Sequence, residues 1–330
     1  MARLEVRELG KDELQLWDTL VIGSDQGTVF HTSNWLFKNA SLLNQALILL
    51  GCYEGDKLVG GCPLFLSNRS SILRLAFSTP RLTPYGGVIA SGIGSAKQRR
   101  KDMHIWNITL SIQEYIAQKR LEYVNLVNSP GLTDIRAFTQ SGWSPEVYYT
   151  YVLPLDNDIL KDAAKDVRQN IRKAQKQDIY SIVKFEPDIF WDLTVRTFAK
   201  QGRKPLSSRA HLVGLLEMIH QQGIGEMRIA NTPSGETIAA DVTVWDTKMA
   251  HSWAAAASPE HLNTGASTLL CYDLFNSLRE RNHKSINMMA GNTPQLSTFI
   301  SSFNPQLVPY YGVGYSRLKF NLAKMLLQIP

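Results

Sequence analysis

The sequence runs twice through one order of predicted secondary structure, and this internal repeat constrains the fold more than any other feature. Each half is predicted to contain three strands joined by tight turns, then a long helix, a strand, a short helix and a final strand. In the first half these elements cover 46–53, 58–66, 72–78, 96–119, 122–127, 132–141 and 146–155. In the second half they cover 226–230, 238–245, 250–258, 266–281, 285–290, 295–303 and 307–313.

The repeat extends to individual residues. Residues 128–130 (Asn-Ser-Pro) precede the short helix of the first half, and residues 292–294 (Asn-Thr-Pro) precede its counterpart. A Tyr-Tyr pair follows each of these helices. A chain of 330 residues also has the usual length of two domains. We therefore predict a mixed α/β (α+β) fold with two copies of one unit, 1–155 and 156–330, each a mixed sheet flanked by helices.

Composition limits the class of protein. Lysine and arginine total 35 against 29 aspartates and glutamates, a net charge of +6 that suits an anionic ligand but is too small to predict DNA binding. Cys52, Cys62 and Cys271 lack the spacing of a zinc site or a disulfide framework, so we predict no metal site and a reducing, cytoplasmic compartment. No apolar run reaches the ~18 residues of a membrane span, so we predict no transmembrane segment.

Sequence motifs of several enzyme classes are missing. The chain has no GxxxxGK[ST] phosphate loop, no GxSxG nucleophile turn and no HExxH metal motif. These absences exclude the forms of nucleotide, esterase and zinc-protease chemistry that depend on those motifs.

The loop before the long helix of the second half is a candidate anion site. Thr264 can cap the helix, and the small residues Gly265, Ala266 and Ser267 leave its first backbone N–H groups accessible. Together with Asn263 they form a loop where the helix dipole would attract a phosphate. An ordinary capped helix that binds nothing has the same pattern, so both interpretations stay open.

One predicted strand pair carries candidate catalytic residues. Asp241 interrupts an apolar strand, where a buried carboxylate is costly unless it is paired or used. If His251 on the next strand lies beside it, the two residues form an acid–base pair. Trp253 follows on the same strand. An Asp241 that caps a bulge or faces solvent is the alternative.

Several polar residues are candidates for binding an acceptor. Arg168 and Arg172 share one face of a predicted helix, which either holds phosphates or the edge of an RNA, or faces solvent. Gln201 and Arg203 lie in a polar loop, where the arginine either binds a carboxylate or phosphate through two hydrogen bonds or belongs to a plain loop that ends a helix. Tyr85, followed by two glycines, either brings a phenol close to a ligand or marks a tight turn.

Several segments resemble the Fem-type peptidyltransferases and their acyltransferase relatives. Residues 168–176, RQNIRKAQK, resemble the R-x-N-I-R-K-A-x-K helix that opens the second domain of those proteins. Residues 198–203 resemble their aromatic-x-x-Q-G segment, and residues 253–267 resemble their donor-binding strand, loop and helix start. Residues 291–311, which include Asn292, resemble the family ending. Tyr85 and the glycines after it have a counterpart in the first domain.

The resemblance implies two tandem GNAT-type (N-acyltransferase) domains. Members transfer an acyl or aminoacyl group from acyl-CoA or aminoacyl-tRNA to an amine of a small molecule or a cell-envelope precursor, without a metal. It implies that Trp253, Asn292 and the loop 263–267 bind the donor. The usual acetyl-CoA loop reads [RQ]-x-x-G-x-[GA], and here His261 takes its first position and Thr264 that of the glycine. Acyl groups other than acetyl therefore stay open.

Two other functions stay open. In an aminoacyl-tRNA-dependent ligase of the Fem type, the basic helix would contact the tRNA. In a degenerate double-GNAT module, the chain would bind a ligand or partner without turnover, which the departure at Thr264 favours. The segment 318–327, with Lys319 and Lys324, is either a packed terminal helix or a helix on a membrane surface.

Overall fold

The computed structural model describes residues 4–68, 74–94, 96–156 and 158–317. The chain folds into two compact units. Among the described residues, unit 1 combines those of 4–148 with 309–317, and unit 2 consists of those of 149–308. The segment 318–327 lies outside the described residues.

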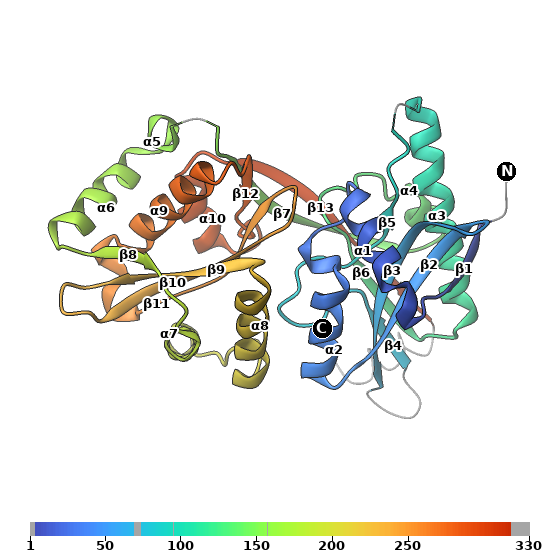
Figure 1. The fold of residues 1–330 in the computed structure, drawn as a ribbon, viewed down its shortest axis with the longest axis horizontal. Coiled ribbons are helices and arrows are strands. Elements are labelled where there is room, and N and C mark those ends of the chain that lie inside the picture. Colours follow the sequence, from blue (N-terminus) through green and yellow to red (C-terminus); the bar gives the residue numbers. More distant parts are fainter. Residues whose placement is uncertain (1–3, 69–73, 95, 157, 318–330) are drawn as a thin grey trace. The chain divides into compact units, whose positions relative to one another are not determined.

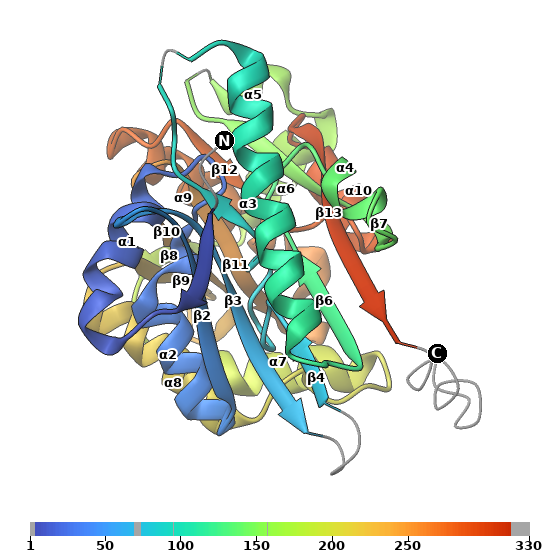
Figure 2. The ribbon, with the colours of Figure 1, turned by 90° about the vertical axis from the view of Figure 1, so that its right-hand side faces the viewer.

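Unit 1 is a mixed sheet with helices on both faces. Its strands are β1 (Glu5–Glu8), β2 (Ala46–Glu54), β3 (Lys57–Asn68), β4 (Arg74–Phe77), β5 (Ile89–Ala90), β6 (Tyr123–Val127) and β13 (Gln306–Ser316). Its helices are α1 (Leu14–Gly23), α2 (Ser33–Leu43), α3 (Gln98–Gln118) and α4 (Arg136–Thr139). The strand order is β1-β2-β3-β4-β6-β13, with β5 beside β3. Helix α3 covers one face, which Figure 2 shows from the front, and α1 and α2 cover the other.

Unit 2 has the same layers. Its strands are β7 (Ser144–Pro154), β8 (Tyr180–Val183), β9 (Gly225–Asn231), β10 (Thr237–Trp245), β11 (Ala250–Ala257) and β12 (Ser285–Asn287). Its helices are α5 (Ile159–Asp162), α6 (Lys165–Lys176), α7 (Pro187–Lys200), α8 (Arg209–Gln222), α9 (Ala266–Glu280) and α10 (Pro294–Ser301). The strand order is β7-β12-β11-β10-β9-β8. In Figure 1, α6, α9 and α10 lie on one side of this sheet and α7 and α8 on the other.

The two units repeat one order of elements, which confirms the predicted mixed α/β fold with a duplicated unit. The elements β2, β3, β4, α3, β6 and α4 of unit 1 correspond in order to β9, β10, β11, α9, β12 and α10 of unit 2. In both units one strand pair is parallel, β4 with β6 and β11 with β12. The predicted strand 285–290 is shorter in the structure, where β12 ends at Asn287.

The last strand of each sequence repeat pairs in the other unit. Strand β7 ends the first repeat, but its residues 152–154 pair with β12 of unit 2. Strand β13 ends the second repeat, but its residues 312–316 pair with β6 of unit 1. The compact units therefore differ from the sequence halves, because each half completes its sheet with a strand from the other.

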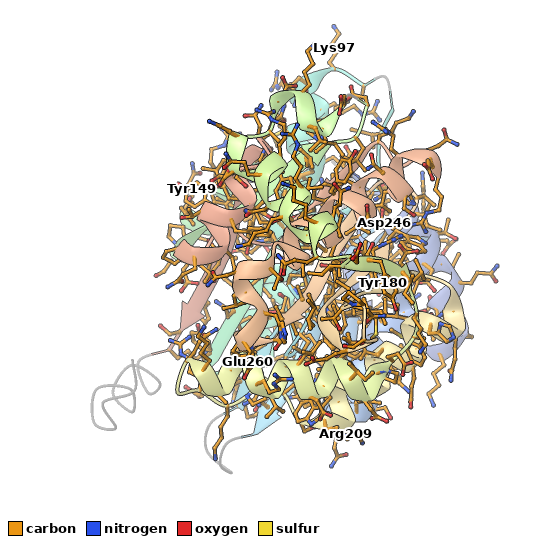
Figure 3. The ribbon with its side chains drawn as sticks, turned by 90° about the vertical axis from the view of Figure 1, so that its left-hand side faces the viewer. Lys97, Tyr149, Tyr180, Arg209, Asp246 and Glu260 are labelled. Atoms are coloured by element: carbon orange, nitrogen blue, oxygen red, sulfur yellow. The ribbon has the colours of Figure 1, made fainter. Side chains whose placement is uncertain are left out.

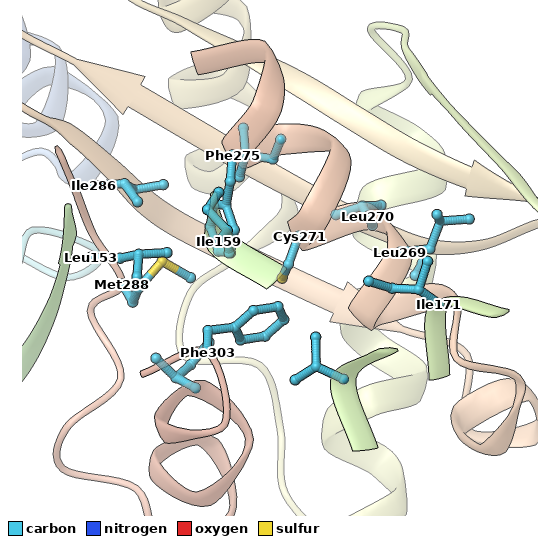
Figure 4. Close-up of a cluster of buried hydrophobic side chains, with 14 of the residues drawn as sticks. Leu153, Ile159, Ile171, Leu269, Leu270, Cys271, Phe275, Ile286, Met288 and Phe303 are labelled. Atoms are coloured by element: carbon cyan, nitrogen blue, oxygen red, sulfur yellow. The ribbon is translucent and has the colours of Figure 1, made fainter. Parts of the chain in front are cut away.

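The core of unit 2 fills the space between its sheet and α6, α9 and α10. Val167, Ile171 and Ala174 are spaced by four and three residues, so they share the buried face of α6. From α9, Cys271 and Phe275 point into the same core (Figure 4). None of the helices in the described ranges is both long and apolar enough to cross a membrane.

The strand exchange leads to a stability prediction. Val313 in β13 is fully buried in the core of unit 1, although it lies near the C-terminus of the sequence. We expect Val313→Ala to lower the free energy of unfolding by about 1–3 kcal/mol, because it removes buried apolar surface and leaves a cavity. Hydrogen exchange should then accelerate in β4 and β6 rather than in β12.

The matched control is Leu307→Ala, which truncates a side chain that is 53% exposed on the same strand. This variant should unfold within about 0.5 kcal/mol of the wild type. A loss of protection in β12, with β6 unchanged, would contradict the exchange.

Candidate functional site

The two parallel strands at the centre of unit 2 separate after two pairs of residues. Ala250 pairs with Ile286 and His251 pairs with Asn287, where β12 ends. Strand β11 continues to Ala257 and stays paired with β10 on its other side. Within the described residues, no strand pairs with 252–257 on the β12 side, so this edge of β11 can receive hydrogen bonds from a ligand.

Local contacts explain why β12 ends at Asn287. The side-chain Oδ1 of Asn287 accepts hydrogen bonds from the Thr150 hydroxyl (2.6 Å) and from the backbone N–H of Met289 (3.1 Å). The second bond turns the chain, and Met289 adopts a φ of 54°. A left-handed conformation costs a non-glycine residue roughly 1–2 kcal/mol. This strained turn directs the chain away from β11.

The other side of the split leads into the start of α9. Strand β11 contains a bulge opposite Val242 and Thr243, which places Trp253 out of register. A 3-10 helix (Pro259–Thr264) then connects β11 to α9. Gly265 has a φ of 83°, and a Cβ there would lie 2.2 Å from the carbonyl oxygen of Asn170 in α6. The glycine therefore allows close packing of the α9 N-terminus on α6, and a larger residue would disrupt this packing before it met any ligand.

A polar network anchors the end of β11 to α7. Ser258 is fully buried, and its hydroxyl contacts the side chains of Arg196 (3.0 Å), Glu260 (2.7 Å) and His261 (3.1 Å). The Ser258 hydroxyl, the Glu260 backbone and the Arg196 guanidinium lower the pKa of Glu260 to about 2. Figure 3 labels Glu260 in this loop. The network fixes the path of the chain from β11 into α9.

The corresponding point of unit 1 is closed by the chain itself. Strands β4 and β6 form three pairs, and the bonding continues from the Ser78 N–H to the Asn125 carbonyl (3.0 Å). The Gly86 N–H then donates to the Val127 carbonyl, and Asn128 Oδ1 accepts from the Val88 N–H (3.0 Å). Residues 78–88 thus cover the place where unit 2 is open. Of the two copies, unit 2 carries the candidate site.

Asp241 is 3% exposed in β10. Its Oδ1 accepts a hydrogen bond from the Thr243 hydroxyl (2.7 Å), and its Oδ2 accepts one from the Ser252 hydroxyl (2.8 Å). Burial raises the pKa of Asp241 to about 6, although both hydroxyls favour the charged form. A carboxyl group with this pKa is suited to accept a proton near neutral pH.

The expected acid–base pair between Asp241 and His251 is not formed. Thr243, which bonds to Asp241, is paired with Ser252, whereas His251 is paired with Val244. Successive residues of a strand point to opposite faces, so His251 lies on the face opposite Asp241. The Nε2 of His251 lies 3.3 Å from Asp246 Oδ2 instead. Sequence reasoning identified the neighbouring strand but not its register.

The predicted donor residues lie around the split. Trp253 is at the bulge of β11, and Asn263 is exposed in the 3-10 helix. Thr264 bonds to the His261 carbonyl and to the Ala266 N–H, while Ala266 is buried and Ser267 is partly exposed in the first turn of α9. Asn292 follows the turn after β12, and its Oδ1 accepts a hydrogen bond from the Tyr149 N–H (2.8 Å).

The predicted acceptor residues are dispersed. Arg168 donates to the carbonyls of Leu160 (2.6 Å) and Ala163 (3.0 Å), so it stabilises the α5–α6 connection. Tyr85 is fully buried in unit 1, where its ring packs edge-on against Phe30 and Tyr310, which corresponds to the tight-turn alternative.

Three predicted acceptor residues remain accessible. Arg172 is exposed on α6, and Gln201 and Arg203 are exposed after α7. Arg172 lines a shallow hollow on α6 with Gln169, Lys173, Lys176 and Gln177. No group of His, Cys, Asp or Glu side chains in the described part of the chain has a metal-binding arrangement.

Sequence reasoning missed Ser252, Thr243 and Asn287. The alternation of Asp241 and Thr243 along one strand was a signal for a shared polar face. Ser252 and Asn287 gave no signal, because their roles depend on the register and the end of β12.

Known proteins resemble this chain in sequence over the second repeat and in fold over both units. Residues 161–295, which include the split and the start of α9, match the family model of the acetyltransferase (GNAT) domain. No curated protein matches the sequence. The structure of FemX is 11% identical, with a TM-score of 0.73 over 98% of this chain and 99% of that chain.

Two further solved structures share the fold over both units. A tandem GNAT protein from the clavulanic acid biosynthesis pathway is 14% identical, with a TM-score of 0.56 over 94% of this chain and 98% of that chain. The C-terminal domain of a putative lysylphosphatidylglycerol synthetase from Agrobacterium fabrum is 11% identical, with a TM-score of 0.58 over 96% of each chain. Residues 161–295, in the second sequence repeat, therefore match the acetyltransferase (GNAT) domain family, and the whole chain shares its fold with FemX and with a tandem GNAT protein.

Proposed function

We propose that unit 2 binds an acyl donor, a CoA thioester or an aminoacyl ester, along β11 and transfers its acyl group to an amine. The observation that carries this proposal is the separation of β11 from β12 after His251 and Asn287. It leaves backbone groups of 252–256 on the open edge of a sheet, where an amide-containing donor can pair with them, whereas the N–H and C=O of Ala257 bond to the Thr197 hydroxyl (3.3 and 3.0 Å).

Three features of the chain supply the chemistry. Backbone N–H groups on β11 polarise the donor carbonyl, and the first-turn N–H groups of α9 bind the anionic part of the donor. Asp241 is the base that receives the proton of the attacking amine. The acceptor is an amine of a small molecule or an envelope precursor, held by Gln201 and Arg203.

Similarity in fold to a lysylphosphatidylglycerol synthetase domain supports an envelope-related acceptor. The three free, buried cysteines fit a reducing compartment, and we place the reaction in the cytoplasm.

The exposed cations of α6 support an aminoacyl-tRNA donor as the second candidate. Arg172, Lys173 and Lys176 are exposed on a helix whose backbone touches the α9 N-terminus at Gly265. A tRNA whose acceptor end lies on β11 would carry its phosphates past this surface.

The donor site can be tested with Ser267→Glu. A glutamate in the first turn of α9 favours the helix by about 0.3–1 kcal/mol, so the protein should keep its stability. The same charge repels an anionic donor, and we expect affinity for acetyl-CoA, succinyl-CoA or charged tRNA to fall at least tenfold, which corresponds to about 1.4 kcal/mol. Native mass spectrometry and calorimetry measure the binding.

Ser267→Gln, of the same size without the charge, is the control and should bind as the wild type does. A folded Ser267→Glu protein with unchanged donor affinity would place the donor elsewhere. A wild type that binds none of the three donors would favour the degenerate module.

The class of donor can be tested by salt dependence. If the donor is tRNA, Arg172→Ala should weaken its binding and reduce the slope of log affinity against log salt by about 0.7–0.9, because one phosphate contact is lost. Acyl-CoA binding should be insensitive to Arg172→Ala. Lys161→Ala, which removes an exposed cation outside the hollow on α6, is the control. Equal salt slopes for all three proteins would exclude α6 as the tRNA contact.

Asp241 also predicts a pH dependence of stability. Because the pKa of Asp241 in the folded protein is about 6, above the ordinary aspartate value of 3.8, the folded state holds the proton more firmly than the unfolded state. The resulting stabilisation is present below about pH 4 and is lost as the pH rises through about 6. We expect this loss to reach up to about 3 kcal/mol.

Asp241→Asn should remove this part of the pH dependence and leave the protein at least as stable as the wild type at pH 7. Chemical unfolding at pH 4, 5, 6 and 7 measures it. Asp192→Asn, at an exposed carboxylate, should keep the wild-type decline. If stability falls equally with pH in the wild type and in Asp241→Asn, burial does not raise the pKa of the Asp241 carboxyl group.

A further inference from the structure

We propose that Ser252 is a catalytic residue whose hydroxyl relays the proton between the attacking amine and Asp241, and that Thr243 positions the carboxylate of Asp241. This inference rests on the proposed acyl transfer. It addresses a difficulty in that mechanism, since Asp241 is 3% exposed and an amine cannot reach it directly.

Ser252 joins the buried carboxylate to the open edge of β11. It is the first residue after the last β11–β12 pair, and it is partly exposed. Its hydroxyl donates to Asp241 Oδ2 at 2.8 Å, which leaves its own lone pairs to accept a proton. Thr243 holds the other carboxylate oxygen at 2.7 Å, which fixes the orientation of the carboxylate.

The duplication shows that the fold does not need polar residues in this layer. The two copies can be aligned on the last pair of their parallel strands. This pair is Phe77 with Asn125 in unit 1 and His251 with Asn287 in unit 2. In unit 1 Phe77 pairs with Phe65 of β3, and in unit 2 His251 pairs with Val244 of β10, so Phe65 corresponds to Val244. Three residues earlier on these strands, Cys62 of unit 1 therefore corresponds to Asp241 of unit 2. Thr243 corresponds in the same way to Leu64.

The strands next to β3 and β10, which are β2 and β9, show the same difference between apolar residues in unit 1 and polar residues in unit 2. Cys62 pairs with Leu50, whereas Asp241 pairs with Arg228. Leu64 pairs with Ile48, whereas Thr243 pairs with Glu226. Unit 1 therefore packs this layer with apolar side chains, and unit 2 fills the same layer with charged and hydroxyl groups. A role in folding alone does not explain the change.

Charged and titratable groups surround Asp241 on two packed elements. From β9, Arg228 favours its ionised form and Glu226 opposes it, and Glu226 is itself paired with Arg228 (3.3 Å) and Arg281 (3.0 Å). From α9, the Cys271 thiol faces Asp241, and burial raises the pKa of that thiol. The two cations partly offset the carboxylates of Glu226 and Asp241.

The proposed step conserves atoms and charge. The amine nitrogen attacks the donor carbonyl, and the new C–N bond forms while the C–S or C–O bond of the donor breaks. The amine proton passes to Ser252 Oγ as the Ser252 hydroxyl proton passes to Asp241 Oδ2. The carboxylic acid then returns a proton through the same hydroxyl to the leaving sulfur or oxygen, which restores the carboxylate.

The test measures transfer to methoxyamine, an amine that stays unprotonated above pH 6, from acetyl-CoA, succinyl-CoA or charged tRNA. The wild-type rate should rise with pH and level off above the pKa of Asp241. Ser252→Ala should lower the rate at pH 7 at least a hundredfold and abolish this rise, with donor affinity unchanged. Ser252→Thr, which keeps the hydroxyl, should restore most of the rate.

The pH–rate profile of Thr243→Val distinguishes a positioning role of Thr243 from a purely structural one. The Thr243 hydroxyl stabilises the ionised carboxylate, so its loss should move the pH–rate profile to higher pH while donor affinity stays the same. A purely structural role predicts one common factor in rate at every pH. Unfolding curves of each variant verify that it is folded.

The outcomes separate the two proposals. Absence of donor binding by the wild type would overturn the proposed function and, with it, the relay. Donor binding and transfer by the wild type, with an unchanged rate and pH profile in Ser252→Ala, would overturn the relay alone. Donor binding without transfer at any pH would also count against the relay.

Discussion

The candidate site depends on one interruption of β-sheet hydrogen bonding, the end of the β11–β12 pairing at His251 and Asn287. Asn287 causes it by bonding with its side chain to Met289, whose φ of 54° directs the chain away from the sheet. The remaining residues of β11 keep β10 on one side and have an open edge on the other. The anchoring of β11 to α7 through Ser258 holds this edge in place, so the donor proposed above would meet groups that are already ordered.

The first copy shows what the fold is without this interruption. Its parallel pairing ends at the equivalent pair, Phe77 with Asn125, but the residues after β4 then bond to the end of β6 and cover the space beside it. The layer under α3 is apolar, with Cys62, Leu64 and Leu50 all buried. The second copy has the same elements in the same order, but its backbone is strained at Met289 and it buries the carboxylate of Asp241. Both features cost stability, and both occur next to the open edge, as expected of a site selected for chemistry.

Much of the fold could be predicted from the sequence, because it depends on local patterns. Apolar spacing and turn residues predicted the element order in each repeat, and the resemblance at 168–176 and 253–267 implied the GNAT family. The exchange of β7 and β13 between units could not be predicted, since either copy of a repeated strand satisfies the same pattern. The Asp241–His251 pair failed for a similar reason, because a side chain's face depends on a register that the sequence does not display.

Ser252 connects the two features that distinguish unit 2 from unit 1, which are the end of β12 at Asn287 and the buried carboxylate of Asp241. Ser78 and Ser252 hold the same register position, one residue past the last aligned parallel pair. In unit 1 the Ser78 hydroxyl accepts a hydrogen bond from the Val127 N–H (2.9 Å), so it helps to join β4 to β6. In unit 2 the chain after Asn287 has turned away, and the Ser252 hydroxyl donates to Asp241 instead. The early end of β12 thus frees a serine that otherwise seals the sheet, and the acidic residue at 241 gives that serine a new partner.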